Sequence, residues 1–470
     1  MTFFRRLSKK LSCSQGYIVF TSLIVVLVIV TLFGIALQFI VLKSKYNSDR
    51  LASLKAYYSA ESGVEIAKKI ISDNSKKRKI IADTSFLHFF GDGASCSTSI
   101  SNMFGYIHVS SLGRCLKQNR NVYAVLGQTL LPEHSSALTL MDSIGDLILA
   151  GNSDITGDVL LGEGCVRKSV ISEMPFIGDK GHNGKQINSR DNKSSVFVEQ
   201  IDTGMARCRD YFSGFKKAQI LIPHSIFIEK QADISKYRGK TVYVEGSIEA
   251  ITNDSFDISG PVTFIIERQL LVGQNIKLRG INFIVNGSVT IKGDALVEEC
   301  YITSFGVSRI TDDAKFSGSI ISSDTLIIDK RAHINHPSFL FSVGKVDNGI
   351  LKGGVLITDS ARVFATVLYK RDLSDNQNTI AKKSLNRVVV NSVVDFKGVV
   401  ISCGSLELAG RIIGHVSANE LLLSKDETVY KNMLFNTKID RSGLAKNYVL
   451  PMIFNKECNP QVISLREYEQ

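Results

Sequence analysis

The sequence predicts a mainly β protein in which one long transmembrane helix at the N-terminus leads into a right-handed β-solenoid. Three observations predict it. Residues 17–42 form an apolar run without a single charge. From about residue 138 onward, short alternating apolar segments are closed by glycine or aspartate. One of these segments recurs later in the chain, which is typical of stacked repeats.

Composition agrees with this fold class. The hydrophobic fraction of the 470 residues is 44%, tryptophan is absent, and there are 36 glycines but only 7 prolines. Such a mixture suits β-structure with tight turns and excludes a disordered chain. The net charge of +11 indicates a basic surface and a basic leader, with anionic envelope surfaces as possible partners. We expect no nucleic-acid partner, because no aromatic-and-basic module accompanies the charge.

Residues 1–16 read as a basic leader and residues 17–42 as a transmembrane helix. The leader carries Arg5, Arg6, Lys9 and Lys10 and no acidic residue. About twenty apolar residues suffice to cross a bilayer, so this run is favoured over a buried core helix or a cleaved signal. The positive-inside rule predicts a single-pass inner-membrane protein with a cytoplasmic N-terminus and an exported body.

Residues 43–75 are expected to extend the same helix with an amphipathic face. Apolar residues recur at steps of three and four, which is the helical period, at Leu54, Tyr57, Ala60, Val64, Ala67 and Ile71. Glu65 precedes Lys69 by four positions, the spacing of a favourable ion pair. The first half of the helix would face lipid and the second would pack on the body or a neighbouring helix.

A family resemblance follows from these residues. Gly16 ends the leader directly before the apolar helix, which then reaches the stretch AYYSAESGVE at residues 56–65. This pattern resembles the N-terminal segment of PilX-type minor pilins. The resemblance covers about the first seventy residues.

The resemblance implies that prepilin peptidase cuts between Gly16 and Tyr17, and that the partners are other pilin-like subunits and their assembly machinery. It also implies a helix assembly motif at Tyr57, Tyr58, Ala60, Glu61, Gly63 and Glu65. Thr21 stands where major pilins carry glutamate. The alternative is an uncleaved signal anchor.

The remaining chain divides into a connecting α+β region at 76–137, a solenoid body at 138–440 and a C-terminal tail at 441–470. The clearest strands, VYVEG to VTIKG, lie between residues 241 and 293. Residues 314–328 align without gaps to a segment beginning at Val394, so that Phe316 matches Phe396. The strands resemble those of right-handed β-helices, including bactofilin-type scaffolds. A β-sandwich is the alternative, and the polar stretches 178–195 and 371–387 are expected to be surface loops.

The eight cysteines form no CxxC or cysteine–histidine cluster, so neither a metal nor a cofactor is expected. Pairing of Cys96 with Cys115 and of Cys165 with Cys208 fits an oxidising compartment by proximity in sequence. Cys300 and Cys403 are expected to be buried thiols.

A polysaccharide-active enzyme would need carboxylates gathered on one face of the solenoid. The best local cluster is Asp312, Asp313, Asp329, Lys330, Arg331 and His333, which we interpret as turn and surface residues. No nucleophile elbow, HExxH or phosphate-cradling loop occurs. The sequence therefore favours a non-enzymatic, minor-pilin-like component of a type IV pilus or pseudopilus. A stand-alone anchored adhesin or scaffold and, more weakly, a β-helix enzyme are the alternatives.

Overall fold

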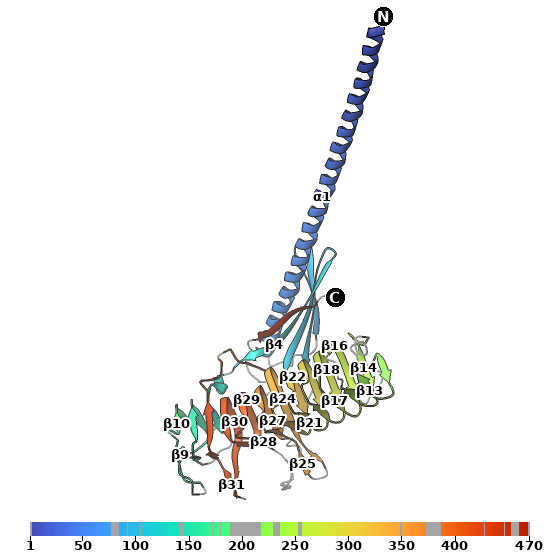
Figure 1. Ribbon diagram of the computed structural model, residues 1–470. Helices are drawn as coiled ribbons and strands as arrows, with labels where there is room; N and C mark the ends of the chain where they lie inside the picture. The colour runs from blue at the N-terminus through green and yellow to red at the C-terminus, as the bar shows by residue number, and fades with distance from the viewer. Residues whose placement is uncertain are drawn as a thin grey trace.

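One helix dominates the N-terminal part of the protein. The computed structural model describes the chain apart from residues 1, 77–83, 92, 104, 131, 141–144, 172, 179, 189–217, 229–235, 252–255, 348–349, 372–386, 427, 446, 453–459 and 469–470. The helix α1 (Thr2–Lys76) is unbroken, and its N-terminal half projects away from the rest of the molecule (Figure 1). The segment contains no proline, which would interrupt a helix of this length.

The C-terminal half of α1 lies on an antiparallel sheet. The sheet comprises β1 (Thr84–Phe89), β2 (Ala94–Met103), β3 (Tyr106–Cys115), β4 (Gln118–Thr129), β34 (Val449–Leu450) and β35 (Pro460–Tyr468). The first four pair in chain order, and the last two both pair with β4. The segment expected to be a C-terminal tail therefore supplies two strands of this sheet.

The body between β4 and β34 is a solenoid of short parallel strands, as the sequence predicted. A 3-10 turn, η1 (Pro132–Ser135), leads into it. The strands on the first rungs are β5 (Leu138–Leu140), β6 (Leu147–Ala150), β7 (Asp154–Thr156), β8 (Val159–Leu161), β9 (Val166–Lys168), β10 (His182–Asn183) and β11 (Gln186–Asn188).

The middle rungs follow in the same manner. Their strands are β12 (Ile220–Ile222), β13 (Ile226–Ile228), β14 (Thr241–Val244), β15 (Ile248–Ala250), β16 (Phe256–Ile266), β17 (Leu270–Val272), β18 (Ile276–Val285), β19 (Val289–Ile291), β20 (Leu296–Ser304), β21 (Ser308–Ile310), β22 (Lys315–Ser322) and β23 (Thr325–Ile328).

The last rungs complete the body. Their strands are β24 (His333–Asp347), β25 (Ile350–Lys352), β26 (Gly354–Ile357), β27 (Arg362–Arg371), β28 (Arg387–Val390), β29 (Asp395–Leu408), β30 (Gly410–Lys425), β31 (Thr428–Lys431), β32 (Met433–Phe435) and β33 (Thr437–Asp440).

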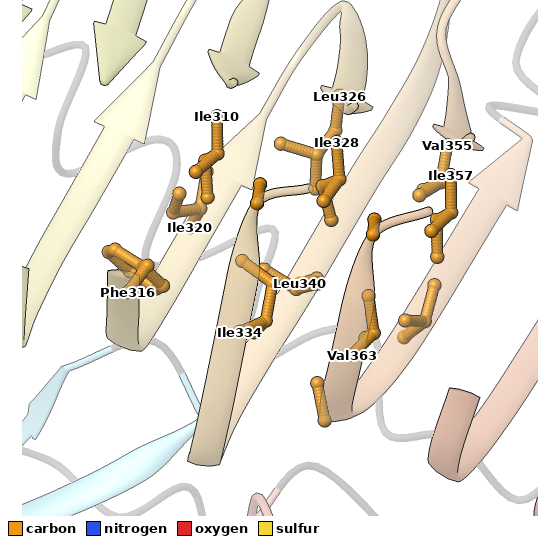
Figure 2. Packing of buried hydrophobic residues seen from close by; sticks show 14 of the residues in the cluster. Ile310, Phe316, Ile320, Leu326, Ile328, Ile334, Leu340, Val355, Ile357 and Val363 are labelled. Carbon is orange, nitrogen blue, oxygen red and sulfur yellow. The ribbon is translucent and has the colours of Figure 1, made fainter. Parts of the chain in front are cut away.

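The solenoid is held together by rows of equivalent residues stacked from rung to rung. Phe316 pairs with Ile334, which pairs with Val363, which pairs with Phe396. All four side chains are buried in one apolar core, so the two halves of the internal repeat occupy equivalent positions. Figure 2 shows the same stacking for Ile320 and Leu340 and for neighbouring residues. An isolated rung would expose these apolar residues to water, so their burial between stacked rungs supplies most of the stability of the solenoid.

The path of the chain through the solenoid is not sequential. β11 pairs with β8, which pairs with β5, whereas β12 pairs with β14. β5 in turn pairs with β30, near the end of the body in sequence. The chain thus builds one end first, passes to the opposite end at β12 and β13, and returns rung by rung to meet β5 (Figure 1).

Two further segments of the chain differ from the division expected from the sequence. The stretch 178–195 was expected to be a surface loop, but β10 and β11 within it form a rung by pairing with β7 and β8. Residues 189–195 and 372–386 lie outside the described residues. The region expected as a mixed connection between 76 and 137 contains the four strands that begin the sheet and the short turn η1.

Candidate assembly and membrane-anchoring site

The N-terminal half of α1 is the one helix, within the described residues, that is long and apolar enough to cross a membrane. Its large apolar side chains are exposed, from Ile18 through Leu42. Exposure of this much apolar surface in water is unfavourable, so this half requires a lipid or protein environment. The finding agrees with a single-pass membrane protein.

The other half of α1 presents a stripe of small side chains to the sheet. The stripe consists of Ala52, Ala56, Ala60, Gly63, Val64, Ala67 and Ile71, which are all buried. Ile100, Ile107, Val109, Val122, Ala124 and Leu126 cover it from the sheet. The expected periodicity is correct for Ala60, Val64, Ala67 and Ile71. It is wrong for Leu54, which is 46% exposed, because the face is centred on the alanines.

Two glycines set the distance between helix and sheet. A Cβ atom at Gly63 would lie 2.2 Å from Ser111 Oγ and 2.4 Å from Thr98 Oγ1. A Cβ atom at Gly113 would lie 1.9 Å from the carbonyl oxygen of Ala56. Ser111 and Thr98 hydrogen-bond each other at 2.9 Å beneath the helix. Gly63, which weakens an isolated helix, is thus required here by close packing.

The other residues of the expected assembly motif point in different directions. Tyr57 is partly buried at the edge of the helix–sheet core, while Tyr58 is 61% exposed. Burial and then the nearby Glu61 carboxylate raise the pKa of Tyr57. Glu65 pairs with Lys68 at 2.9 Å, not with the expected Lys69. Ala60 and Gly63 therefore serve the chain's own sheet, whereas Tyr58 and Glu65 remain on the free side of α1.

The expected processing site lies within α1. Gly16 and Tyr17 are helical in the structure, and their side chains are outside the described part of the chain. Thr21 Oγ1 donates a hydrogen bond to the carbonyl oxygen of Ile18 at 3.0 Å. The hydroxyl is thereby satisfied within the helix, and it brings no charge into the apolar segment.

The opposite face of the sheet joins the solenoid. Tyr106 and Val125 of the sheet pack with Phe339, Phe341 and other residues of the outer solenoid face. Arg466 of β35 forms an ion pair with Glu299 of the solenoid at 3.0 Å. The sheet is therefore a middle layer, with α1 on one face and the solenoid on the other.

A partly buried histidine lies in this joint. The ring of His108 meets that of Tyr301 edge to face, with 4.2 Å between centroids. Its Nε2 atom is enclosed and lacks a hydrogen-bond partner among the described residues. Burial lowers the pKa of His108 to about 4, so the ring is neutral at physiological pH.

The cluster considered for catalysis lies at one corner of successive rungs. Asp312 and Asp313 form ion pairs with Lys330 and Arg331 of the next rung, at 3.8 and 3.0 Å. The Arg331 guanidinium hydrogen-bonds Asp313 and lowers the pKa of that carboxyl. Asp329 lies 3.9 Å from Arg309, again across one rung. These side chains are thus brought together, as a ladder of ion pairs between turns.

The same corner carries a signal that the sequence reasoning missed. Four of these turns are followed by a fully buried alanine, then one residue, then the apolar residue of the stacked row. The alanines are Ala295, Ala314, Ala332 and Ala361, preceding Val297, Phe316, Ile334 and Val363. The inside of the corner takes alanine at these four rungs and Val394 before Phe396, so a search for a small apolar residue, any residue and a larger apolar residue would have found the rungs.

The described cysteines are free. Cys96 and Cys115 are both buried thiols, which contradicts the expected disulfide. They face α1 from adjacent strands, because Cys115 pairs with Ala94 and Cys96 with Gly113. Cys208 lies outside the described residues. Cys300 is buried as expected, and Cys403 is only partly so. No group of His, Cys, Asp or Glu within the described part of the chain is arranged to hold a metal ion.

The chain resembles a solved pilin structure only weakly. No family model matches the chain, and no curated protein matches it. Among solved structures, the chain is similar to the competence-associated pilin ComZ from Thermus thermophilus at 10% sequence identity. The match covers 89% of this chain and 98% of that one, with a TM-score of 0.22.

Proposed function

We propose that this protein is a minor-pilin-like component of a type IV pilus or pseudopilus, anchored by α1 and carrying the solenoid as a non-enzymatic recognition or capping body. The observation that carries the proposal is the division of α1 into two halves. The first is apolar and exposed, and the second is fixed to an antiparallel sheet through Gly63 and Gly113. A subunit of a helical filament needs such a free apolar half to pack among neighbouring helices.

The free side of the second half offers a further surface for neighbours. Leu51, Leu54 and Tyr58 are all substantially exposed along α1, opposite the alanine stripe. Their spacing of three and four residues places them on one helical face. The assembly motif implied by the resemblance therefore divides into Ala60 and Gly63, which hold the sheet, and Tyr58, which is available to a partner.

The solenoid favours a position at the end of a filament. It lies across the end of the sheet remote from the N-terminus of α1 (Figure 1). The joint is buried and partly aromatic, so the body is held in a fixed orientation rather than tethered. A body that extends to both sides of the sheet would obstruct identical subunits stacked alongside, and it suits a single terminal copy.

The testing experiment is mass spectrometry of the mature N-terminus, using protein from native membranes with and without prepilin peptidase. The proposal predicts a chain that begins at Tyr17 only when the peptidase is present. A Gly16→Leu variant should stay uncut, while a Ser14→Ala variant provides a matched leader substitution that is still processed. Retention of Met1 in the presence of the peptidase would refute the pilin assignment.

One observation favours a stand-alone anchored adhesin or scaffold instead. Thr21 provides no carboxylate, and its hydroxyl is already bonded to Ile18. In major pilins the corresponding glutamate is thought to neutralise a neighbour's amino terminus. If the leader is retained, the positive-inside rule still places the N-terminus in the cytoplasm and the body outside the inner membrane.

A further inference from the structure

A strained and exposed leucine marks the membrane-facing end of the sheet. Leu116 begins the tight turn between β3 and β4, where Cys115 pairs with Gln118. Its φ of 54° lies in the left-handed region, which glycine or asparagine usually occupies. Its side chain is 82% exposed. A leucine in this position is unfavourable for both backbone strain and solvation in the isolated chain.

A second apolar side chain lies at the same end. Phe89 closes β1 and is 71% exposed. The register places Phe89 opposite Ser95, and Ser95 opposite Arg114, one residue before Cys115. The two hairpin ends therefore present Phe89 and Leu116 together. In Figure 1 both ends point along α1 toward its N-terminus.

Basic side chains surround this apolar end. Arg114 and Lys117 lie near Leu116 and are exposed, and α1 adds exposed Lys43, Lys45 and Arg50 at the same end of the sheet. Among the described residues here one carboxylate, Asp49, opposes them, and Asp92 in the β1–β2 turn lies outside the described residues. An apolar tip within a basic collar complements the interface of an anionic bilayer, where apolar groups enter the acyl boundary and cations meet lipid phosphates.

The helix sets the distance between this tip and the bilayer. Cys115 packs against Ala52 and Ala56, so the turn at Leu116 lies beside the part of α1 just before Ala52. From Leu42, where the apolar run ends, to Ala52 the helix rises about 15 Å. The headgroup zone accounts for about 5–8 Å of that distance.

Tilting of the anchor closes the remaining gap. The charge-free run 17–42 is roughly 39 Å long, against a hydrocarbon core of about 30 Å. A helix that is too long for the bilayer tilts. A tilt toward the alanine stripe brings the sheet end down to the membrane surface.

We propose that the sheet end formed by Phe89, Leu116, Arg114 and Lys117 docks on the anionic bilayer in which α1 is anchored. The contact orients the solenoid relative to the membrane before any assembly. It depends on the anchor and is independent of leader cleavage or filament incorporation. The occupant is a lipid surface containing anionic headgroups.

The absence of tryptophan from the chain allows a direct test. The full-length Leu116→Trp variant is reconstituted into vesicles of phosphatidylcholine and phosphatidylglycerol, with bromine-labelled acyl chains as quenchers. The matched control is Phe227→Trp, because Phe227 is 63% exposed and belongs to β13, at an end of the solenoid away from α1 (Figure 1). Phe89→Trp is a second reporter in case Leu116→Trp fails to fold.

Docking predicts that Trp at 116 or 89 emits at shorter wavelength than Trp at 227 in the same vesicles. The bromolipid should quench the emission at 116 or 89 and leave the emission at 227 unaffected. Adding Arg114→Gln and Lys117→Gln, or omitting phosphatidylglycerol, should decrease the quenching severalfold. Quenching at 116 and 89 no greater than at 227 would overturn the proposal. Quenching that is unchanged both by the Gln substitutions and by omission of phosphatidylglycerol would refute an anionic lipid surface as the binding partner.

Discussion

Gly63 of α1 lies so close to Ser111 of β3 that a Cβ atom added to the glycine would come within 2.2 Å of the serine hydroxyl. The contact joins the membrane helix to the sheet at the level where Thr98 and Ser111 bond each other. Helix propensity favours alanine here, whereas packing requires glycine, and the two effects can be separated by substitution.

Gly63→Ala should destabilise the protein by about 1–2 kcal/mol, because the cost of overpacking exceeds the gain in helix propensity. Urea unfolding in detergent, followed by circular dichroism, measures the change. Gly34→Ala is the matched control, since nothing lies within 4 Å of its added methyl group. Adding Ser111→Ala and Thr98→Ala should restore much of the loss. Equal stability of the Gly63 and Gly34 variants would contradict the close-packing interpretation.

A buried side chain within a rung should contribute far more to folding stability than an ion pair at the corner of the rung. Phe316 is fully buried in the stacked row, so Phe316→Ala should cost about 3–5 kcal/mol. Asp313→Ala removes an ion pair whose partners are both exposed, and the urea midpoint should stay close to that of the wild type. A large loss from Asp313→Ala would assign the corner ladder a structural role that its exposure does not support.

The sequence allowed the rungs to be predicted but not their order. Alternation, glycine turns and the match of Phe316 with Phe396 are local signals, and they indicated a solenoid correctly. Pairing of β12 with β14, and of β5 with β30, depends on which rungs meet after a long excursion of the chain. Every rung offers a similar apolar face, so periodicity cannot specify the neighbour.

The site was predictable to a similar extent. Ala60, Val64 and Ala67 were placed on the buried helix face by their spacing alone. The sheet beneath them requires β35, which pairs with β4 from the far end of the chain and contains a register shift near Val462. A strand so distant in sequence carries no local sign of its partner. The expected Cys96–Cys115 bond rested on closeness in sequence, which takes no account of the strand register that sets Cys96 opposite Gly113 and Cys115 opposite Ala94.

Thiol labelling tests the cysteine assignment. Cys96 and Cys115 are buried under α1, and burial raises the pKa of the Cys96 thiol, so both should resist a brief maleimide pulse. Cys165 and Cys403 are partly exposed and should react before these two. After denaturation without reductant, peptide mapping should show both buried cysteines labelled. Labelling that appears only after reduction would establish a disulfide in place of two thiols.

Acid should weaken the joint between sheet and solenoid through His108. The folded-state pKa is about 4 and the ordinary value is 6.5, so the unfolded chain binds a proton first as pH falls. The stabilisation is complete above pH 6.5 and is lost progressively toward pH 4, by up to about 3 kcal/mol.

Urea unfolding at a series of pH values measures this dependence. His108→Phe retains a ring against Tyr301 and should flatten the curve. A shallower slope should persist, because burial also lowers the pKa of His336 in the same joint. Curves of the same slope for wild type and variant would show that His108 is not the responsible group.

Relief of strain at the sheet tip should separate stability from membrane docking. Leu116→Gly removes the cost of holding a leucine in the left-handed backbone region. We expect the free energy of unfolding, measured with urea, to rise by about 1 kcal/mol. The same change removes the apolar tip, so a Phe89→Trp reporter in this background should show weaker bromolipid quenching than in the parent. A matched variant, Asp426→Gly, relieves a positive φ of 49° elsewhere and should leave quenching unchanged. A residue that destabilises its own turn and yet strengthens contact with lipid is best explained by selection for the membrane-bound state. A loss of stability in Leu116→Gly, or undiminished quenching, would instead assign the leucine a role within the folded chain.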